Sequence, residues 1–169
     1  MSFPLRHRLG PLLQPRSIAM VGASNQAGRI GGMPLDLLRH FGYAGKVFPV
    51  NPKYQEVFGY TCYPDIESLP EAPDLVVLAI GAEDVTAMLE RCHAKGIPGA
   101  IVYGAGFAEA GESGELLQRT LEDFVERSGM VVAGPNCMGF ANLNLQAHTA
   151  FASVFRDVPP QPPPGECSR

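Results

Sequence analysis

The sequence lacks the long apolar run that a membrane-spanning helix requires, and it lacks any closely paired cysteines. Its longest apolar stretches, such as LVVLAI at residues 75–80, are far shorter than the roughly 20 residues needed to cross a bilayer. The four cysteines are scattered without a Cys-x-x-Cys pair, which argues against a zinc site and against a disulfide framework. The first 17 residues contain no uninterrupted apolar segment before a small-residue cleavage site, so we expect no secretory signal and a cytoplasmic protein.

The sequence also lacks a surplus of positive charge. Its formal net charge is −4, so no global attraction to nucleic acid is expected, and any anion must be held by a local arrangement. A length of 169 residues with 46% hydrophobic and 18% charged side chains is typical of one ordinary globular domain. We expect this domain over residues 16–155. A leader at 1–15 precedes it, and a proline-rich linker or truncated tail at 156–169 follows it.

Short apolar stretches alternate with segments of helical periodicity along the chain. The expected strands cover residues 17–23, 45–52, 74–81, 99–106 and 130–139, and the expected helices cover residues 34–42, 82–96 and 112–129. Residues 59–70 are expected to hold a short strand and one helical turn. Because strands that are apolar throughout and alternate with helices are typical of a parallel sheet covered on both faces, we predict an α/β fold. It is a Rossmann-like, doubly wound, mainly parallel sheet with helices on both faces.

The loop after the first expected strand, VGASNQAGRIGG, is rich in glycine. In doubly wound sheets, ligands bind outside the carboxyl ends of the strands. A loop with Gly22 and Gly28 between a strand and a helix places backbone N–H groups and the positive end of the helix dipole around an anion, which suits a pyrophosphate. The spacing is neither G-x-G-x-x-G nor a Walker A loop, so a purely structural role of the glycines in a tight turn stays open. If the loop binds phosphate, Gly22→Val is expected to block the site and leave the fold mostly intact.

The loop after the second expected strand differs from that of NAD-binding proteins. In those proteins an acidic residue about 20 residues after the glycine loop accepts hydrogen bonds from the ribose hydroxyls. This chain has Asn51, Pro52 and Lys53 there. Because a lysine suits a phosphate, the sequence favours a nucleotide with an additional phosphate, either coenzyme A (CoA) with its ribose 3′-phosphate or NADP. A lysine that is merely a solvated surface charge is the alternative.

Four stretches of the chain resemble a known family: RSIAMVGAS, GKVFPVNPKYQEVFGYTCYPDIESLPEAPDLVVLAI, GAGFAEAGESG and GPNCMGFANLN. In this order and without large gaps over residues 11–155, they resemble the N-terminal CoA-binding domain of the NDP-forming acyl-CoA synthetases, also called ADP-forming acetyl-CoA synthetases. The succinyl-CoA synthetase α-subunit is a more distant relative that shares the same loops. The resemblance implies that CoA is the ligand.

The resemblance also implies which residues contact CoA, and all of them follow expected strands. They are Gly22, Ala23, Ser24, Asn25 and Gly28 after the first strand, Asn51, Pro52 and Lys53 after the second, Ile80 and Gly81 after the third, Tyr103, Gly104, Ala105 and Gly106 after the fourth, and Asn136 and Cys137 after the fifth. Two positions depart from the family, which often has Pro where this chain has Gly81 and Ser where it has Gly104. We interpret Cys137 as a residue that lines the pocket, because the sequence shows no base paired with it.

The resemblance finally implies a reaction that this chain does not complete alone. In the complete enzymes, acyl-CoA and phosphate give an acyl phosphate, whose phosphoryl group passes to a histidine and then to ADP in an ATP-grasp domain. None of the four histidines lies in a glycine-rich phosphate loop, and nothing in the chain resembles an ATP-grasp domain. We therefore expect no catalytic residue and no metal site in this chain, which depends on succinyl-CoA-ligase-like and ATP-grasp domains. We interpret His148 as structural.

Three hypotheses for the function follow. The chain is the CoA-binding domain of an acyl-CoA ligase, a stand-alone module that binds or senses CoA, or a fragment of an NADP-dependent oxidoreductase. Lys53 and the later glycine-rich loops favour CoA. The expected partners are CoA or acyl-CoA and the remaining domains or subunit of the enzyme, with neither nucleic acid nor a membrane among them.

Overall fold

The computed structural model describes residues 8–159, and its centre is a five-stranded parallel sheet with the strand order β2-β1-β5-β6-β7. The strands are β1 (Ser17–Val21), β2 (Lys46–Val50), β5 (Leu75–Leu78), β6 (Gly99–Val102) and β7 (Val131–Ala133). The helices are α1 (Gly10–Leu13), α2 (Met33–His40), α3 (Ala82–Ala94) and α4 (Glu112–Ser128), with 3-10 helices η1 (Ala108–Ala110) and η2 (Ser153–Asp157). Two antiparallel hairpins complete the described chain: β3 (Glu56–Val57) with β4 (Tyr60–Thr61), and β8 (Ala141–Asn142) with β9 (Ala147–His148). The predicted α/β class and parallel sheet are confirmed.

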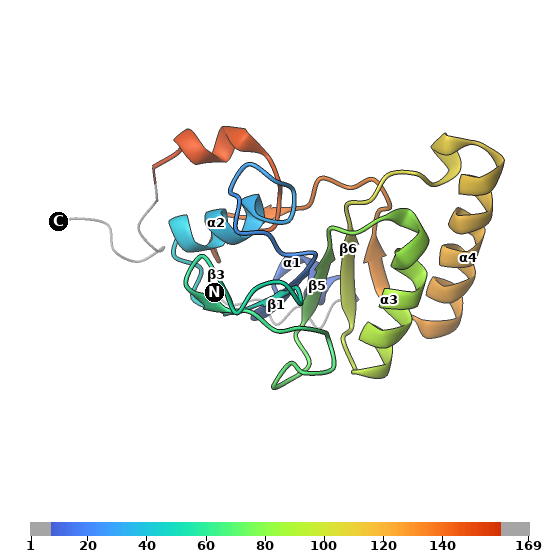
Figure 1. Ribbon diagram of the computed structural model, residues 1–169, viewed down its shortest axis with the longest axis horizontal. Coiled ribbons are helices and arrows are strands. Elements are labelled where there is room, and N and C mark those ends of the chain that lie inside the picture. Colours follow the sequence, from blue (N-terminus) through green and yellow to red (C-terminus); the bar gives the residue numbers. More distant parts are fainter. Residues whose placement is uncertain (1–7, 160–169) are drawn as a thin grey trace.

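Each face of the sheet is covered by different helices, as Figure 1 shows. Alternate residues of β1 point to opposite faces. Ala19 and Val21 belong to a core cluster with α3 and α4, whereas Ile18 and Met20 belong to a second cluster with α1 and α2. All five residues of β1 are buried, because the strand lies between β2 and β5 and is covered on both sides. The prediction of helices on both faces is therefore correct.

Several elements differ from the prediction. Residues 59–70 contain the expected short strand, β4, but the expected helical turn is absent there, and the chain forms turns instead. The β3–β4 hairpin turns at Phe58 and Gly59, both with positive φ, as a two-residue hairpin loop requires. The strands themselves are shorter than predicted, since the glycine- and proline-containing ends of the predicted segments are loops. The segments α1, η1, η2 and the β8–β9 hairpin were not predicted, because elements of two to five residues have too little periodicity to be recognised.

The segments before β1 and after β7 also contribute contacts to the domain. Leu12 of α1 is buried in the second core cluster. After β7 the chain passes to the α2 side, where Phe155 of η2 packs with Leu37 and Phe41. Arg156 forms an ion pair with Asp36 of α2 at 3.4 Å. The predicted leader and tail lie partly outside the described residues, so the predicted bounds at 16 and 155 stay predictions. In the described part of the chain, no helix is long and apolar enough to cross a membrane.

Candidate functional site

The carboxyl ends of the five parallel strands form one edge of the sheet. The connection from β1 to β2 runs through α2 on one face, whereas α3 and α4 connect β5, β6 and β7 on the other face. The strand order therefore reverses between β1 and β5, which is the position where ligands bind in doubly wound sheets. In Figure 1 the loops after β1, β6 and β7 lie together at this edge.

Gly22, the first residue after β1, is packed against the loop that follows β5. Its φ is +82°, and a Cβ added to it would overlap the carbonyl oxygen of Ala79. Its N–H donates to the carbonyl oxygen of Val50 at the end of β2, at 3.1 Å. Gly22 thus allows the backbones of three neighbouring strands to meet at the switch point. The expectation that Gly22→Val would leave the fold mostly intact is wrong, because the added side chain would collide with the protein itself.

The remainder of the first loop is held by its own hydrogen bonds. The Ser24 N–H donates to the Gly31 carbonyl at 3.1 Å, and the loop leads into α2. The N-cap of α2 is Gly32, which offers no side chain to the first N–H groups of the helix. The Gly32 and Met33 N–H groups donate to the Arg29 carbonyl at 2.9 and 2.8 Å, and Pro34 has no N–H, so it is the dipole of α2 rather than its first N–H groups that favours an anion at this edge.

Arg29 lies in the same loop and was missed as a candidate by the sequence analysis. It is exposed, and its Nε donates to the Gln26 side chain at 2.7 Å. This bond leaves the terminal nitrogens of the guanidinium for another partner, such as a phosphate. A basic residue inside a glycine-rich loop is the sequence signal that would have identified Arg29.

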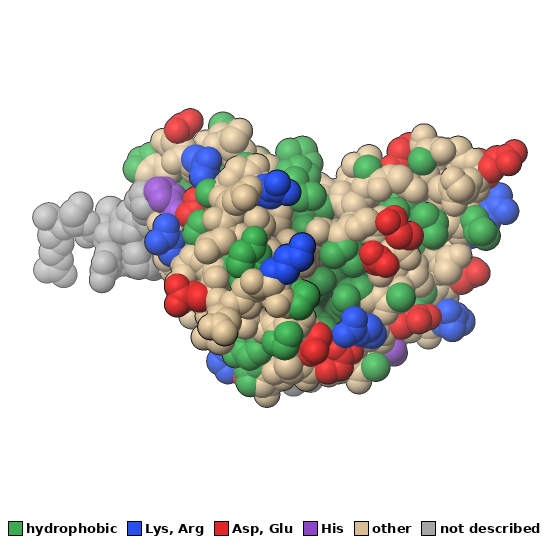
Figure 2. All heavy atoms as spheres, viewed as in Figure 1, with side chains coloured by type: hydrophobic (Ala, Val, Ile, Leu, Met, Phe, Trp, Pro, Cys, Tyr) green, Lys and Arg blue, Asp and Glu red, His purple; other side chains and the backbone are tan. Residues whose placement is uncertain are grey.

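Asn51 links the loop after β2 to the loop after β1. Its Nδ2 donates to the Ala23 carbonyl at 2.8 Å, and its Oδ1 accepts from the Lys53 backbone N–H at 2.9 Å. The side chain of Asn51 is thus occupied by the protein, and its function here is to place Pro52 and Lys53 beside the first loop. Lys53 is exposed. Figure 2 shows basic side chains beside the hollow in the middle of the face that it draws.

The loop after β6 begins with a residue whose side chain points inward. Tyr103 is 4% exposed, and its hydroxyl donates to the Thr149 carbonyl. Burial raises the pKa of this phenol well above its usual value. Only the backbone of Tyr103 is therefore available at the edge. Gly104 comes next and packs against the loop after β5, where an added Cβ would lie 2.9 Å from the Ile80 carbonyl oxygen.

The loop after β7 is hydrogen-bonded to the loop after β6. The Asn136 N–H donates to the Gly104 carbonyl at 3.0 Å, and the Cys137 N–H donates to the Val102 carbonyl at 3.2 Å. The Cys137 sulfur accepts the Gly139 N–H at 3.4 Å. Beside these loops, α3 begins after Gly81, which provides no side-chain cap. A second helix N-terminus thus lies at the edge.

A family model described as "CoA binding domain" matches residues 16–142. The chain belongs to this family. Coenzyme A is accordingly the ligand, as the family resemblance implied; Lys53 and the glycine-rich loops had favoured it and left NADP open.

Three similar proteins are larger than this CoA-binding domain. The acetate–CoA ligase [ADP-forming] I of Archaeoglobus fulgidus is 40% identical over 143 residues, which cover 85% of this chain and 21% of the ligase. The α subunit of acetate–CoA ligase [ADP-forming] II of Pyrococcus furiosus is 34% identical over 142 residues, covering 84% of this chain and 31% of the subunit. A solved structure of dinucleotide-forming acetyl-coenzyme A synthetase 1 from Ca. Korarchaeum cryptofilum, in complex with phosphate and ADP, gives a TM-score of 0.81 at 33% identity. The matched region covers 89% of this chain and 32% of the synthetase chain. The chain thus spans about a fifth to a third of these relatives.

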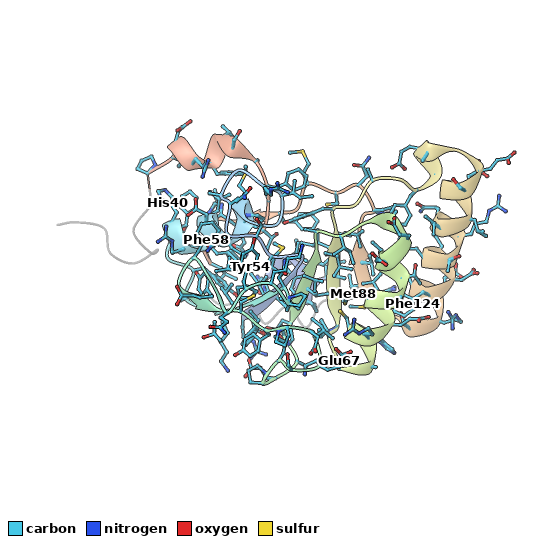
Figure 3. The ribbon with its side chains drawn as sticks, viewed as in Figure 1. His40, Tyr54, Phe58, Glu67, Met88 and Phe124 are labelled. Atoms are coloured by element: carbon cyan, nitrogen blue, oxygen red, sulfur yellow. The ribbon has the colours of Figure 1, made fainter. Side chains whose placement is uncertain are left out.

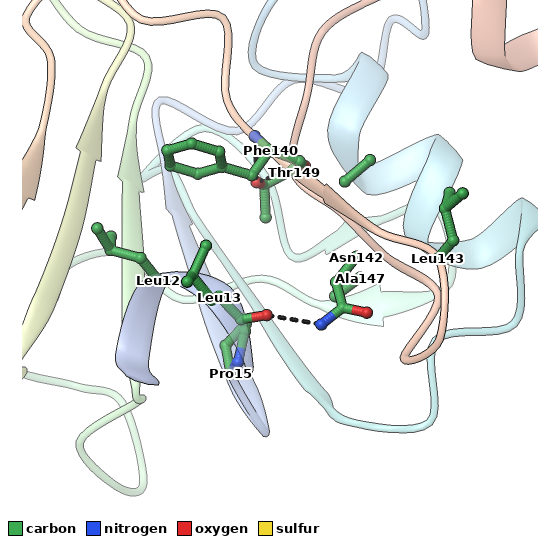
Figure 4. Close-up of a pocket in the computed structure, with 9 residues that line it drawn as sticks. Leu12, Leu13, Pro15, Phe140, Asn142, Leu143, Ala147 and Thr149 are labelled. Carbon is green, nitrogen blue, oxygen red and sulfur yellow. Dashed lines mark hydrogen bonds between the residues drawn. The ribbon is translucent and has the colours of Figure 1, made fainter. Parts of the chain in front are cut away.

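The five loops of this CoA-binding domain contain all of the predicted contact residues. The structure brings their backbones to one edge, but the side chains of Tyr103 and Asn51 are engaged within the protein. A cavity among the described residues lies away from these loops. Its volume is about 280 Å³, and it is lined by α1 and the β8–β9 hairpin, where Asn142 Nδ2 donates to the Leu13 carbonyl at 2.7 Å (Figure 4). The assignment of individual CoA contacts stays a prediction.

Proposed function

We propose that this domain supplies the CoA site of an ADP-forming acyl-CoA ligase, which converts acyl-CoA, ADP and phosphate into acid, CoA and ATP. The observation that supports this proposal is the 40% identity to the Archaeoglobus fulgidus acetate–CoA ligase [ADP-forming] I over 85% of the chain. We propose residues 16–155 as the bounds of the domain and the cytoplasm as its compartment.

The polar groups at the carboxyl edge suit the charge of CoA. In the proposed complex, the pyrophosphate lies against the Asn25 backbone N–H and the positive end of the α2 dipole, with Arg29 beside it, because the N–H groups of Gly22, Ala23 and Ser24 already donate to the carbonyls of Val50 and Gly31. Lys53 receives the ribose 3′-phosphate. The pantetheine arm extends over the loops after β5 and β6, toward Asn136 and Cys137, where the thiol meets the acyl group.

The reaction requires groups that lie outside this chain. We propose that a histidine carries the phosphoryl group and that an ATP-grasp domain transfers it to ADP, on the same polypeptide or on a partner. The Pyrococcus furiosus relative is named as a subunit α, which supports an arrangement over more than one chain.

The ligand proposal is tested by calorimetric titration of the full chain with CoA, 3′-dephospho-CoA and NADPH. We expect CoA to bind more tightly than dephospho-CoA and NADPH not to compete with it. Tight NADPH binding without CoA binding would contradict the proposal.

The ligase proposal is tested in a chimera, in which this chain replaces the matching segment of the Archaeoglobus fulgidus ligase. We expect ATP formation from acetyl-CoA, ADP and phosphate, and no ATP formation when the segment is deleted. A chimera that binds CoA and fails to form ATP would favour the stand-alone module instead.

A further inference from the structure

The cavity between α1 and the β8–β9 hairpin lies on the α2 side of the sheet (Figure 4). Seven of its nine lining residues are apolar, and none of the nine carries a charge. Its volume of about 280 Å³ can accept a large apolar side chain, because an apolar cavity of about 150 Å³ is sufficient for benzene.

The two polar residues of the lining are bonded within the protein. Asn142 Nδ2 donates to the Leu13 carbonyl at 2.7 Å, and its Oδ1 accepts two backbone N–H groups of the β8–β9 turn. The Thr149 hydroxyl donates to the Phe140 carbonyl at 3.0 Å. Because the polar side chains of the lining are already paired in the described chain, the cavity is better suited to an apolar group than to a small polar molecule.

Three of the lining residues are large apolar residues that are themselves exposed. They are Leu13 at the end of α1, Phe140 before β8 and Leu143 in the turn of the hairpin. Asn142 bonds the hairpin to α1, so the three side chains are held on one surface, which we call the hairpin face. Exposed apolar side chains gathered around a cavity are typical of a surface that another protein covers.

The opposite side of the sheet provides a comparison. Met88 of α3 and Phe124 of α4 pack into the core cluster on that side (Figure 3). Among the described residues of these two helices, Leu116 is the single large apolar residue that is exposed. One exposed leucine is normal on a protein surface, whereas a group of such residues around a cavity is not.

Most of the cavity lining lies outside the region that the family shares. Six of the nine lining residues lie outside residues 16–142, which the family model matches. A solved structure of a conserved hypothetical protein from Pyrococcus furiosus is 28% identical, with a TM-score of 0.55. The match covers 95% of that protein and 72% of this chain, so a small relative exists without a counterpart for more than a quarter of this chain.

The hairpin is shared with a ligase subunit. The α subunit of acetate–CoA ligase [ADP-forming] I of Pyrococcus furiosus is 32% identical over 158 residues, which cover 91% of this chain and 34% of the subunit. A match that covers 91% of the chain leaves out too few residues to exclude the hairpin. The segment that forms the hairpin face thus occurs in a protein that continues far beyond the CoA-binding domain.

We propose that the hairpin face docks the remaining part of the ligase, with one apolar side chain of that part seated in the cavity and others against Leu13, Phe140 and Leu143. The proposal rests on the proposed ligase function, because the occupant belongs to that enzyme. Covering the exposed apolar side chains favours association through the hydrophobic effect. The Asn142 bonds fix the surface in advance, which reduces the entropy lost on docking.

The test compares hydrogen–deuterium exchange of the amides of residues 141–148 in this full chain and in its chimera with the Archaeoglobus fulgidus ligase. We expect exchange in the chimera to be slower by about tenfold or more, because docking covers the hairpin. Leu143→Asp should remove most of this protection, since it places a charge against an apolar surface, and should leave the CoA affinity of the separate chain unchanged. Leu116→Asp is the matched control, since Leu116 is 67% exposed and Leu143 60%, and it should keep the protection.

ATP formation by the chimera reports separately on the ligase proposal. A chimera that forms ATP while its hairpin exchanges as fast as in the separate chain would overturn the docking surface and leave the ligase proposal standing. Equal protection in Leu143→Asp and Leu116→Asp would overturn it too. Exchange in the separate chain that slows with increasing chain concentration would assign the face to a second copy of the chain and overturn this occupant. Protection without ATP formation would support the docking surface and contradict the proposed reaction.

Discussion

At the scale of single residues, two of the glycines of the first loop lead to different predictions. Gly22 has positive φ and no room for a Cβ, whereas Gly28 has open space around it. Gly22→Ala should lower the free energy of unfolding by about 1–3 kcal/mol or more, from backbone strain and overlap with Ala79. Gly28→Ala should change it by less than about 0.5 kcal/mol.

Urea unfolding of both variants followed by tyrosine fluorescence is the measurement for this pair. Because both substitutions add one methyl group to the same loop, the difference between them isolates the switch-point geometry. Equal stability of the two variants would show that the loop relaxes around Gly22 and that the close approach is not required.

The proposed contact of Lys53 predicts how the domain distinguishes CoA from its analogues. If its ammonium contacts the 3′-phosphate, Lys53→Ala should weaken CoA by about 1–3 kcal/mol and leave 3′-dephospho-CoA nearly unchanged. The control is Lys46→Ala, which removes the same charge at the opposite end of β2, where Lys46 pairs with Glu71 at 2.5 Å. Calorimetric titration of both variants with CoA and 3′-dephospho-CoA measures these affinities. Equal losses of affinity for the two ligands in Lys53→Ala would assign Lys53 a structural role.

Residue roles that depend on long-range partners could not be predicted from the sequence. Tyr103 was predicted to contact CoA, and only the structure shows that its hydroxyl reaches Thr149, 46 residues away. Asn51 was predicted as a contact in the same way, although its amide joins two loops. His148 was interpreted as structural, and nothing in the sequence indicates that both of its nitrogens lack partners among residues 8–159.

At the scale of elements, the long strands and helices were predictable, and most of the short elements, β4 and β7 excepted, were not. α3 and α4 have 13 and 17 residues and a clear apolar face, so periodicity located them to within two residues. The apolar strands β1 and β5 were equally clear. The β8–β9 hairpin has two residues in each strand and is held by Thr149 and Phe140, whose mutual hydrogen bonds no local pattern indicates.

The link between the loops after β1 and β2 is tested by Asn51→Ala. The substitution leaves the Ala23 carbonyl and the Lys53 N–H without their partner, so we expect the free energy of unfolding to fall by about 1–3 kcal/mol. CoA affinity should fall as well, because Lys53 loses its fixed position beside the first loop. Thermal unfolding and CoA titration measure the two effects.

Asn144→Ala is the matched control for this prediction. Asn144 is exposed in the β8–β9 turn, where only its backbone N–H bonds to Asn142. This variant should retain both stability and CoA affinity. If Asn51→Ala lost stability and kept full CoA affinity, the bridge would serve the fold alone, and the loop after β2 would not be part of the CoA site.

At the scale of the whole molecule, the two faces of the sheet are packed differently. The α3–α4 face is a continuous apolar core, in which Cys92 is so buried that the pKa of its thiol rises to about 12. The α2 face is completed by the chain that returns after β7, and this segment brings the one buried histidine of the described chain against Phe41. Stability should therefore depend on pH through the α2 face.

The sign of this dependence follows from His148. Its pKa in the folded state lies below the reference value of 6.5, so the unfolded state binds a proton that the folded state does not. The free energy of unfolding should accordingly fall as pH decreases below about 6.5, by at most about 1.4 kcal/mol at pH 5.5. Glu67 and Glu109, whose pKa values are lowered from 4.5, contribute only at more acidic pH. Urea unfolding at pH 7.5 and pH 5.5 measures the loss.

His148→Phe should abolish most of the decrease in the free energy of unfolding between pH 7.5 and pH 5.5, since phenylalanine does not titrate. His93→Gln removes an exposed imidazole from α3 and should keep the loss of the parent chain. If His148→Phe were as sensitive to pH as the parent, the imidazole would be reached by water or protons in the folded state.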